Sequence, residues 1–215
     1  MTTFIWRECT CAVCGSTHEY DYLGSIFAFT AYDDLDFRPN DYRRSLIRVS
    51  LHECPDCGYV SKEVSDECPV PAEFLNSSSY QNCDGREFTD NEGGRRYYRK
   101  YLIDRYLNNK EAALQDLIHG AWASDDCLDE TNANVFRELA LPYIKEEIQN
   151  QPENEKLWLV RADLLRRNGR FKELKEEYQD KVFQNDRYNR ILALQLKLTE
   201  EGDTASHLQY EALRD

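Results

Sequence analysis

The chain has 215 residues, of which 41% are hydrophobic and 12% aromatic, so it can bury the core of one or two domains. Its 27 Lys+Arg and 40 Asp+Glu give a net charge of -13, and residues 1–94 carry 7 of the basic but 17 of the acidic side chains. Because duplex DNA is bound by neutralising its phosphates with Lys and Arg, this acidity argues against DNA binding by the amino-terminal half.

The amino terminus, MTTFIWRECT, lacks the basic region followed by an apolar one that marks an export signal. The longest apolar stretches are far shorter than the roughly 20 residues of a membrane-spanning helix. We therefore expect a cytoplasmic protein without a membrane partner.

Three segments of the first 60 residues are typical of β-strands. Residues 4–10 and 20–32 are rich in aromatic and β-branched side chains, and apolar residues alternate with polar ones over 47–51. Together they predict a short antiparallel sheet.

Cysteines dominate the same region. The eight cysteines are at positions 9, 11, 14, 54, 57, 68, 83 and 127, and seven of them lie before residue 90. In a reducing compartment such crowding indicates metal binding rather than disulfides. Four of them form two turns of one pattern, Cys11-Ala-Val-Cys14-Gly and Cys54-Pro-Asp-Cys57-Gly. The two-residue spacing lets both thiolates of a turn face one cation, and the glycine that follows permits a positive φ.

The paired turns predict a zinc-ribbon site with one structural zinc held by Cys11, Cys14, Cys54 and Cys57. A closed four-cysteine site leaves no position for water or substrate, so we do not expect catalysis by the metal. The 39 residues between the turns exceed the usual gap of about 15 to 20, so an insertion must be accommodated. Iron accepts the same ligands, and the spacing leaves the choice between the two metals open.

Other candidate ligands carry weaker signals. Cys9 could replace Cys11, but a small packed hydrophobe is the favoured interpretation. His18 and His52 lie near the turns, where they could hydrogen-bond a thiolate or end a strand. Cys68 and Cys83 have no CxxC spacing and are not predicted to bind metal, and the sequence assigns no role to Cys127.

The insertion contains the polar segment DDLDFRPN at 33–40. Its Asp34, Asp36 and Arg38 either order the insertion through local hydrogen bonds, which we favour, or form a functional cluster. Residues 65–94, with two prolines and a Gly-Gly pair, are predicted to be a linker or covering loop.

After residue 94 the apolar residues recur at helical spacing. The predicted helices are 95–107, 110–124, 132–150, 155–168, 171–185, 187–201 and 203–213. The hairpin of Trp158, Ala162, Gly169 and Leu174 has the residue order of a tetratricopeptide hairpin, whose repeat is about 34 residues. A plain helical bundle is the alternative.

Two groups of arginines stand out. Residues 95–106 interleave Arg with Tyr, which can track a single-stranded nucleic acid, but a packed tyrosine stripe with solvated arginines is favoured. The arginines between 161 and 170 are likewise interpreted as a solvated face. We find no phosphate-binding glycine loop, GxSxG elbow or HExxH helix, so an enzyme is unsupported.

Five segments follow one another along the chain: CAVCG, DLDFRPNDY, HECPDCGYV, GAWASDD and FRELALPYIKEEI. Through these segments, in this order, the chain resembles the bacterial family called domain of unknown function 2225. The resemblance covers most of the chain. It implies a bacterial cytoplasmic protein with paired CxxC turns and tetratricopeptide-like helices, and it brings no established activity.

We therefore predict an α+β protein with a zinc-ribbon-like domain at 1–64, a linker at 65–94 and a helical-hairpin domain at 95–215. Its expected role is a zinc-binding scaffold that holds a protein or peptide partner in a groove of the helices. A nucleic-acid-binding regulator is the alternative, and an enzyme with a site between the domains is a weaker third.

Overall fold

The computed structural model describes residues 3–25 and 32–214 and has the predicted α+β class. The chain forms two compact units. Unit 1 combines Met1–Phe29 with Tyr42–Ala133, and unit 2 combines Thr30–Asp41 with Asn134–Asp215. This division differs from the predicted domain boundaries, because the first two long helices belong to unit 1 and a short piece of the insertion belongs to unit 2.

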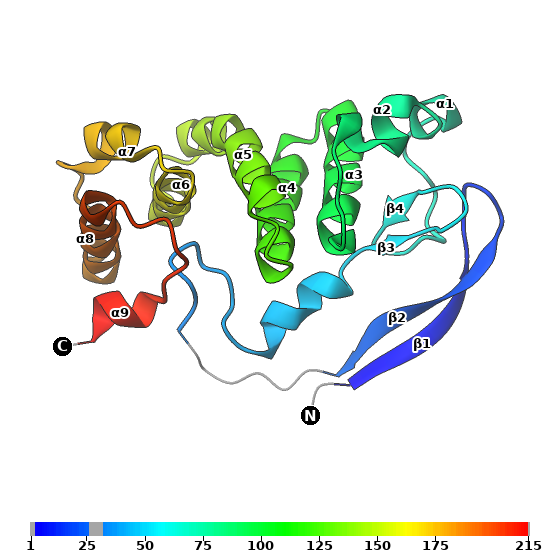
Figure 1. Ribbon diagram of the computed structural model, residues 1–215, viewed down its shortest axis with the longest axis horizontal. Coiled ribbons are helices and arrows are strands. Elements are labelled where there is room, and N and C mark those ends of the chain that lie inside the picture. Colours follow the sequence, from blue (N-terminus) through cyan, green and yellow to red (C-terminus); the bar gives the residue numbers. More distant parts are fainter. Residues whose placement is uncertain (1–2, 26–31, 215) are drawn as a thin grey trace. The chain divides into compact units, whose positions relative to one another are not determined.

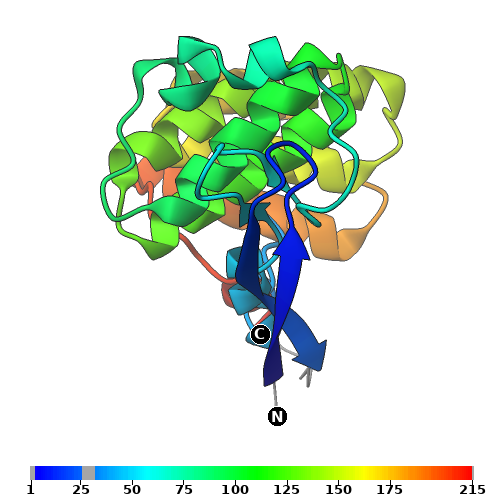
Figure 2. The same cartoon turned by 90° about the vertical axis from the view of Figure 1, so that its right-hand side faces the viewer.

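Unit 1 begins with a β-hairpin, in which β1 (Thr3–Thr10) pairs antiparallel with β2 (Thr17–Ser25), as Figures 1 and 2 show. The strand predicted at 4–10 is confirmed. The one predicted at 20–32 is confirmed as far as Ser25, and 26–31 lie outside the described residues. Tyr20 and Tyr22 of β2 are buried against Val64.

The strand predicted at 47–51 is wrong. Instead, η1 (Tyr42–Arg48) is a 3-10 helix, and strand pairing begins only with β3 (His52–Glu53), which pairs with β4 (Val60–Ser61). The hydroxyl of Ser50 donates to the carbonyl of Leu46 at 2.6 Å and the N–H of Val49 donates to the same oxygen at 3.0 Å. The bond from Val49 uses a backbone N–H that a strand would offer to a neighbour.

The segment predicted as a linker contains three short helices, α1 (Ala72–Leu75), α2 (Ser78–Gln81) and η2 (Cys83–Gly85). Its Gly-Gly pair lies inside the next helix rather than in a loop. Asn91 caps that helix by accepting from the N–H of Gly94 at 2.8 Å, and a Cβ on Gly94 would lie 2.6 Å from the Asn91 amide. The cap therefore explains the glycine.

Two long helices complete unit 1. α3 (Glu92–Tyr106) and α4 (Lys110–Asp126) pack against each other and bury apolar side chains such as Leu102 and Leu117. α3 also contacts β4 and η2, so it forms the support on which the small sheet of β3 and β4 rests.

Unit 2 is helical apart from the segment of the insertion. Its helices are α5 (Glu130–Asn150), which starts at the boundary with unit 1, α6 (Glu155–Arg167), α7 (Phe171–Tyr178), α8 (Asp186–Glu201) and α9 (Gln209–Leu213). α7 is shorter than predicted because the amide of Asn189 binds both the N–H and the carbonyl of Phe183, at 2.7 and 2.9 Å, in a non-helical connection.

The hairpin of α6 and α7 turns at Gly169, whose φ is +68°. The hydroxyl of Tyr178 donates to the carbonyl of Trp158 at 3.0 Å, which ties the two helices together. The tetratricopeptide-like arrangement of further repeats stays a prediction.

Two of the four arginines of this hairpin are not part of a solvated face, whereas Arg170 is exposed as predicted. Arg161 and Arg166 are 3% and 0% exposed. Arg161 binds Glu173 at 2.9 Å and also binds Glu177, whereas Arg166 binds Asp163 at 2.7 Å. Burial of a guanidinium is compatible with stability because each charge has a hydrogen-bonded partner.

Candidate metal centre

The two cysteine turns have the same backbone geometry. In the first turn the N–H of Gly15 donates to the carbonyl of Cys11 at 2.9 Å, and in the second the N–H of Gly58 donates to the carbonyl of Cys54 at the same distance. The two glycines have φ angles of +75° and +74°, as the sequence pattern predicted. Each turn connects the strands of a hairpin, β1 with β2 and β3 with β4.

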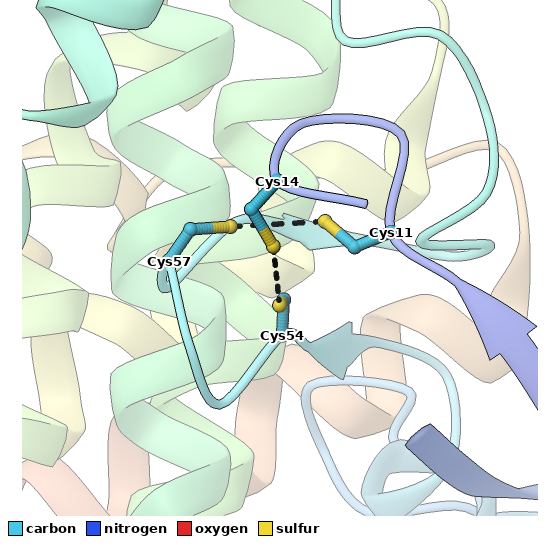
Figure 3. A group of neighbouring side chains, drawn as sticks. All are labelled: Cys11, Cys14, Cys54 and Cys57. Atoms are coloured by element: carbon cyan, nitrogen blue, oxygen red, sulfur yellow. Dashed lines mark hydrogen bonds between the residues drawn. The ribbon is translucent and has the colours of Figure 1, made fainter. Parts of the chain in front are cut away.

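The four sulfur atoms of the predicted site lie close together and point toward one another (Figure 3). The Sγ atoms of Cys11 and Cys57 are 3.7 Å apart, those of Cys14 and Cys54 are 3.5 Å apart, and all four lie within 4.8 Å of one another. In a tetrahedron with metal–sulfur bonds of about 2.3 Å, sulfur atoms are separated by about 3.8 Å. The donor set therefore fits a tetrahedrally coordinated ion such as zinc.

The thiols differ in environment. Cys11 and Cys54 are buried, whereas Cys14 is exposed. Burial raises the pKa of Cys57 and of Cys11, while the hydroxyl and then the backbone N–H of Ser16 lower the pKa of Cys14 to about 6. Metal binding requires all four sulfurs to lose their protons, so a bound cation has to offset the cost that burial places on the negative charge of Cys57 and Cys11.

Helices α2 and α3 hold the second turn by its carbonyl groups. Gln81 donates from Nε2 to the carbonyl of Cys57 at 3.0 Å, and the hydroxyl of Tyr80 donates to the carbonyl of Gly58 at 2.9 Å. Arg99 donates to the same Gly58 oxygen at 3.4 Å and forms an ion pair with Glu53. Sequence reasoning missed these supports, because the arginine lies in a stretch that it assigned to the solvated surface.

The two histidines near the turns have different surroundings. His18 lies 2.8 Å from a carboxylate oxygen of Asp56, and both are within 4.8 Å of the Cys54 sulfur. His52 is buried, with its ring nitrogens 2.8 Å from the carbonyl of Lys62 and 3.0 Å from that of Asp21. His52 therefore joins strands rather than touching a thiolate.

The remaining cysteines lie outside the four-sulfur group. Cys9 packs with Tyr22, its sulfur 3.4 Å from the hydroxyl, as expected of a packed side chain. Cys68 contacts the carbonyl of Val70 at 3.4 Å, Cys83 is buried, and Cys127 is exposed at the end of α4. None of the four joins a cluster of metal-ligating side chains within 3–25 and 32–214.

The arginines of α3 are engaged by carboxylates. Arg95 binds Glu53 at 3.1 Å, Arg96 binds Glu92 at 3.2 Å and Arg105 binds Asp84 at 3.4 Å. The neighbouring tyrosines are buried, at positions 97, 98 and 101. These tyrosines form the packed stripe that the sequence favoured. Because carboxylates pair with the arginines, little positive charge is left to bind a phosphate backbone.

Asp34, Asp36 and Arg38 are buried in unit 2. The N–H of Arg38 donates to Asp36 Oδ1 at 3.1 Å and the N–H of Asp34 donates to the carbonyl of Arg38 at 2.8 Å, so the favoured interpretation, local ordering, is confirmed. Burial, aided by the carboxylates of Asp163 and Asp34, raises the pKa of Asp36 to about 6.

Comparison of the chain with protein-family models, with curated proteins and with solved structures finds no match in any of the three. Within the described residues, no helix combines the length and the apolar character that crossing a membrane requires.

Proposed function

We propose that this protein is a zinc-binding interaction module of the cytoplasm, in which one structural zinc is held by Cys11, Cys14, Cys54 and Cys57. The observation that carries the proposal is the meeting of four sulfur atoms within 4.8 Å of one another. Zinc is chosen over iron because paired CxxC turns of this type are common in structural zinc sites.

Zinc would act by joining two hairpins that are too small to be stable alone. Two-stranded sheets are marginal in water, and a small sheet cannot bury enough apolar surface to fold by itself. A metal bound at both turns converts its binding energy into folding energy of unit 1.

The role of the folded protein would be to hold a protein or peptide partner, as helical arrays do in the grooves between their hairpins. A protein partner is preferred to nucleic acid because the net charge is -13 and the arginines of α3 are paired with carboxylates. No arrangement of side chains in the described part of the chain favours an enzymatic function over this one.

The test is unfolding of the full-length protein with and without a zinc chelator, followed by circular dichroism and tryptophan fluorescence. We expect the chelator to lower the melting temperature of unit 1 and added zinc to restore it. The interaction role is tested by affinity capture from a lysate of the source cells, using the zinc-loaded protein and a Cys54→Ser, Cys57→Ser variant. A partner that the zinc-loaded protein retains and the variant loses supports the proposal. Failure to capture any specific partner contradicts it.

A further inference from the structure

The β1–β2 hairpin has one face that is left exposed. Residues opposite each other in an antiparallel pair point to the same side, and alternate residues point to opposite sides. The inner face carries Tyr20 and Tyr22, which are buried. The register places four opposing pairs on the outer face: Phe4 and Leu23, Trp6 and Asp21, Glu8 and Glu19, and Thr10 and Thr17.

The outer face is apolar at one end. Trp6 is 70% exposed, Phe4 is 45% exposed and Leu23 is 37% exposed. Aromatic side chains that are gathered and exposed on one surface mark interaction sites more often than scattered ones do. β1 and β2 form a two-stranded sheet in the described residues, so each strand also has an edge with no neighbouring strand.

The other end of the face is acidic. Glu8 lies directly opposite Glu19, and both side chains are exposed. Like charges at directly opposite positions destabilise a strand pair. Neither carboxylate has an ion pair among residues 3–25 and 32–214, so the chain keeps an unfavourable pair that its own cations do not relieve.

The same face continues into a pocket. Phe4 and Asp21 are among the residues that line a cavity of about 620 Å³ in unit 1, together with the apolar Ile47 and Val49. Four carboxylates line the cavity against two arginines, and one of these, Arg96, already binds Glu92. The cavity thus adds apolar contact area next to Phe4 and further negative charge.

We propose that the outer face of the β1–β2 hairpin binds a basic, extended segment of a partner protein. The segment would pair with the free edge of β1, place apolar side chains over Phe4 and Trp6, and place Lys or Arg beside Glu8 and Glu19. Exposed carboxylates repel phosphates, which disfavours a nucleic acid at this surface. The inference rests on the proposed interaction role, and it places a contact surface on the hairpin in addition to the helices.

The probe is a fluorescein-labelled octapeptide, Lys-Thr-Lys-Thr-Val-Thr-Val-Thr, whose alternate residues present two lysines and then two valines when it runs antiparallel to β1. Its control is the same peptide with Glu in place of Lys. Binding to the full-length, zinc-loaded protein is followed by fluorescence anisotropy. We expect saturable binding of the lysine peptide that weakens with added salt, and no binding of the glutamate peptide.

Two double variants distinguish binding at this surface from a general attraction of the peptide to the negative charge of the protein. Glu8→Lys with Glu19→Lys changes the hairpin, and Glu153→Lys with Glu200→Lys makes the same change of charge at exposed positions in unit 2. We expect affinity to fall about tenfold or more in the hairpin variant and to stay within about twofold in the control. Trp6→Ser is expected to weaken binding by a similar factor without changing the salt dependence.

Equal loss in both double variants, or no binding by the parent protein, would overturn the inference. So would self-association through the hairpin, seen as a light-scattering mass that falls to that of one chain in Trp6→Ser. Zinc content is measured on the same samples. Failure of peptide binding with zinc retained counts against the hairpin surface alone, whereas absence of zinc counts against the proposed function.

Discussion

The guanidinium of Arg99 in α3 donates a hydrogen bond to the carbonyl oxygen of Gly58, the residue that follows the last cysteine of the second turn, across 3.4 Å. The same side chain forms an ion pair with Glu53, which precedes the first cysteine of that turn. One helical residue therefore holds both ends of the turn. The second turn of the candidate metal centre is built onto α3 and is not an independent ribbon.

Replacing Arg99 should weaken both the fold and the metal site. In Arg99→Met the carboxylate of Glu53, about 10% exposed, loses its most buried partner and keeps only the more exposed Arg95. Removing one member of a buried pair costs about 3 to 5 kcal/mol, and partial compensation by Arg95 should bring the loss toward about 2 kcal/mol. Denaturant unfolding measures the loss, and the rate of zinc transfer to a chelator should rise in parallel.

The matched control is Arg105→Met, which removes a more exposed ion pair with Asp84 from the same helix. Such pairs contribute up to about 1 kcal/mol, so the control should unfold close to the parent and release zinc at the parental rate. Equal effects of the two substitutions would show that Arg99 has no special part in holding the turn.

The two turn glycines offer a second matched comparison. Both have positive φ, but a Cβ on Gly58 would lie 2.6 Å from a guanidinium nitrogen of Arg99, whereas a Cβ on Gly15 would meet nothing within 4 Å. Gly15→Ala should cost only the backbone strain of about 1 kcal/mol. Gly58→Ala should cost more, because it also displaces Arg99 from Glu53. Melting temperatures of the two zinc-loaded variants test the order, and a greater loss in Gly15→Ala would contradict it.

The acidic end of the hairpin face predicts a stabilising substitution. Glu8→Lys converts a like-charge pair with Glu19 into an opposite-charge pair. The free energy of unfolding should rise by about 0.5 kcal/mol at low salt, and the gain should shrink as salt is added. Glu200→Lys, at an exposed position of α8, is the control and should show no gain that depends on salt. No gain in Glu8→Lys would mean that the two carboxylates do not repel each other.

A buried carboxyl in α4 predicts a dependence of stability on pH. Burial and then a hydrogen bond with Asp104 raise the pKa of Asp116 from 3.8 to about 9, against the opposing influence of Lys100 and Lys62. The folded protein therefore keeps a proton that the unfolded chain loses, so this group's contribution to stability declines as the pH rises from about 4 toward 9.

Asp116→Asn removes the titration while keeping a group that can donate to Asp104. The variant should gain stability relative to the parent as the pH is raised from 5 to 8, by up to about 1.4 kcal/mol per pH unit. Urea unfolding at several pH values measures the difference. A difference that is constant over this range would show that Asp116 is ionised in the folded state.

The sequence predicted the parts of the site that depend on local patterns. The CxxC-Gly spacing identified Cys11 and Cys54 with their partners, and helical periodicity placed α3 to α8 to within a few residues except at the end of α7. The strand predicted at 47–51 failed because the backbone forms a 3-10 helix as far as Arg48 and the N–H of Val49 then bonds to the carbonyl of Leu46, which alternation does not reveal.

Contacts between distant residues could not be predicted in this way. Arg99 and Glu53 are 46 positions apart, and only the fold brings them together. Arginine is a residue type usually found on the surface, yet Arg166 is fully buried, and the carbonyls of Asp203 and Ala205 accept its hydrogen bonds. No spacing rule links such residues, so their burial and partners became visible only in the structure.

The most direct test of the account is elemental analysis of the natively purified, full-length protein, with zinc and iron measured per chain. Three samples are compared: the parent, Cys54→Ser with Cys57→Ser, and the control Cys68→Ser with Cys127→Ser, whose sulfurs lie outside the four-sulfur group. We predict one zinc ion per chain in the parent and in the control, and loss of zinc together with a lower melting temperature in the first variant. Iron in place of zinc, or a parent without metal whose melting temperature matches that of the first variant, would contradict a structural zinc site.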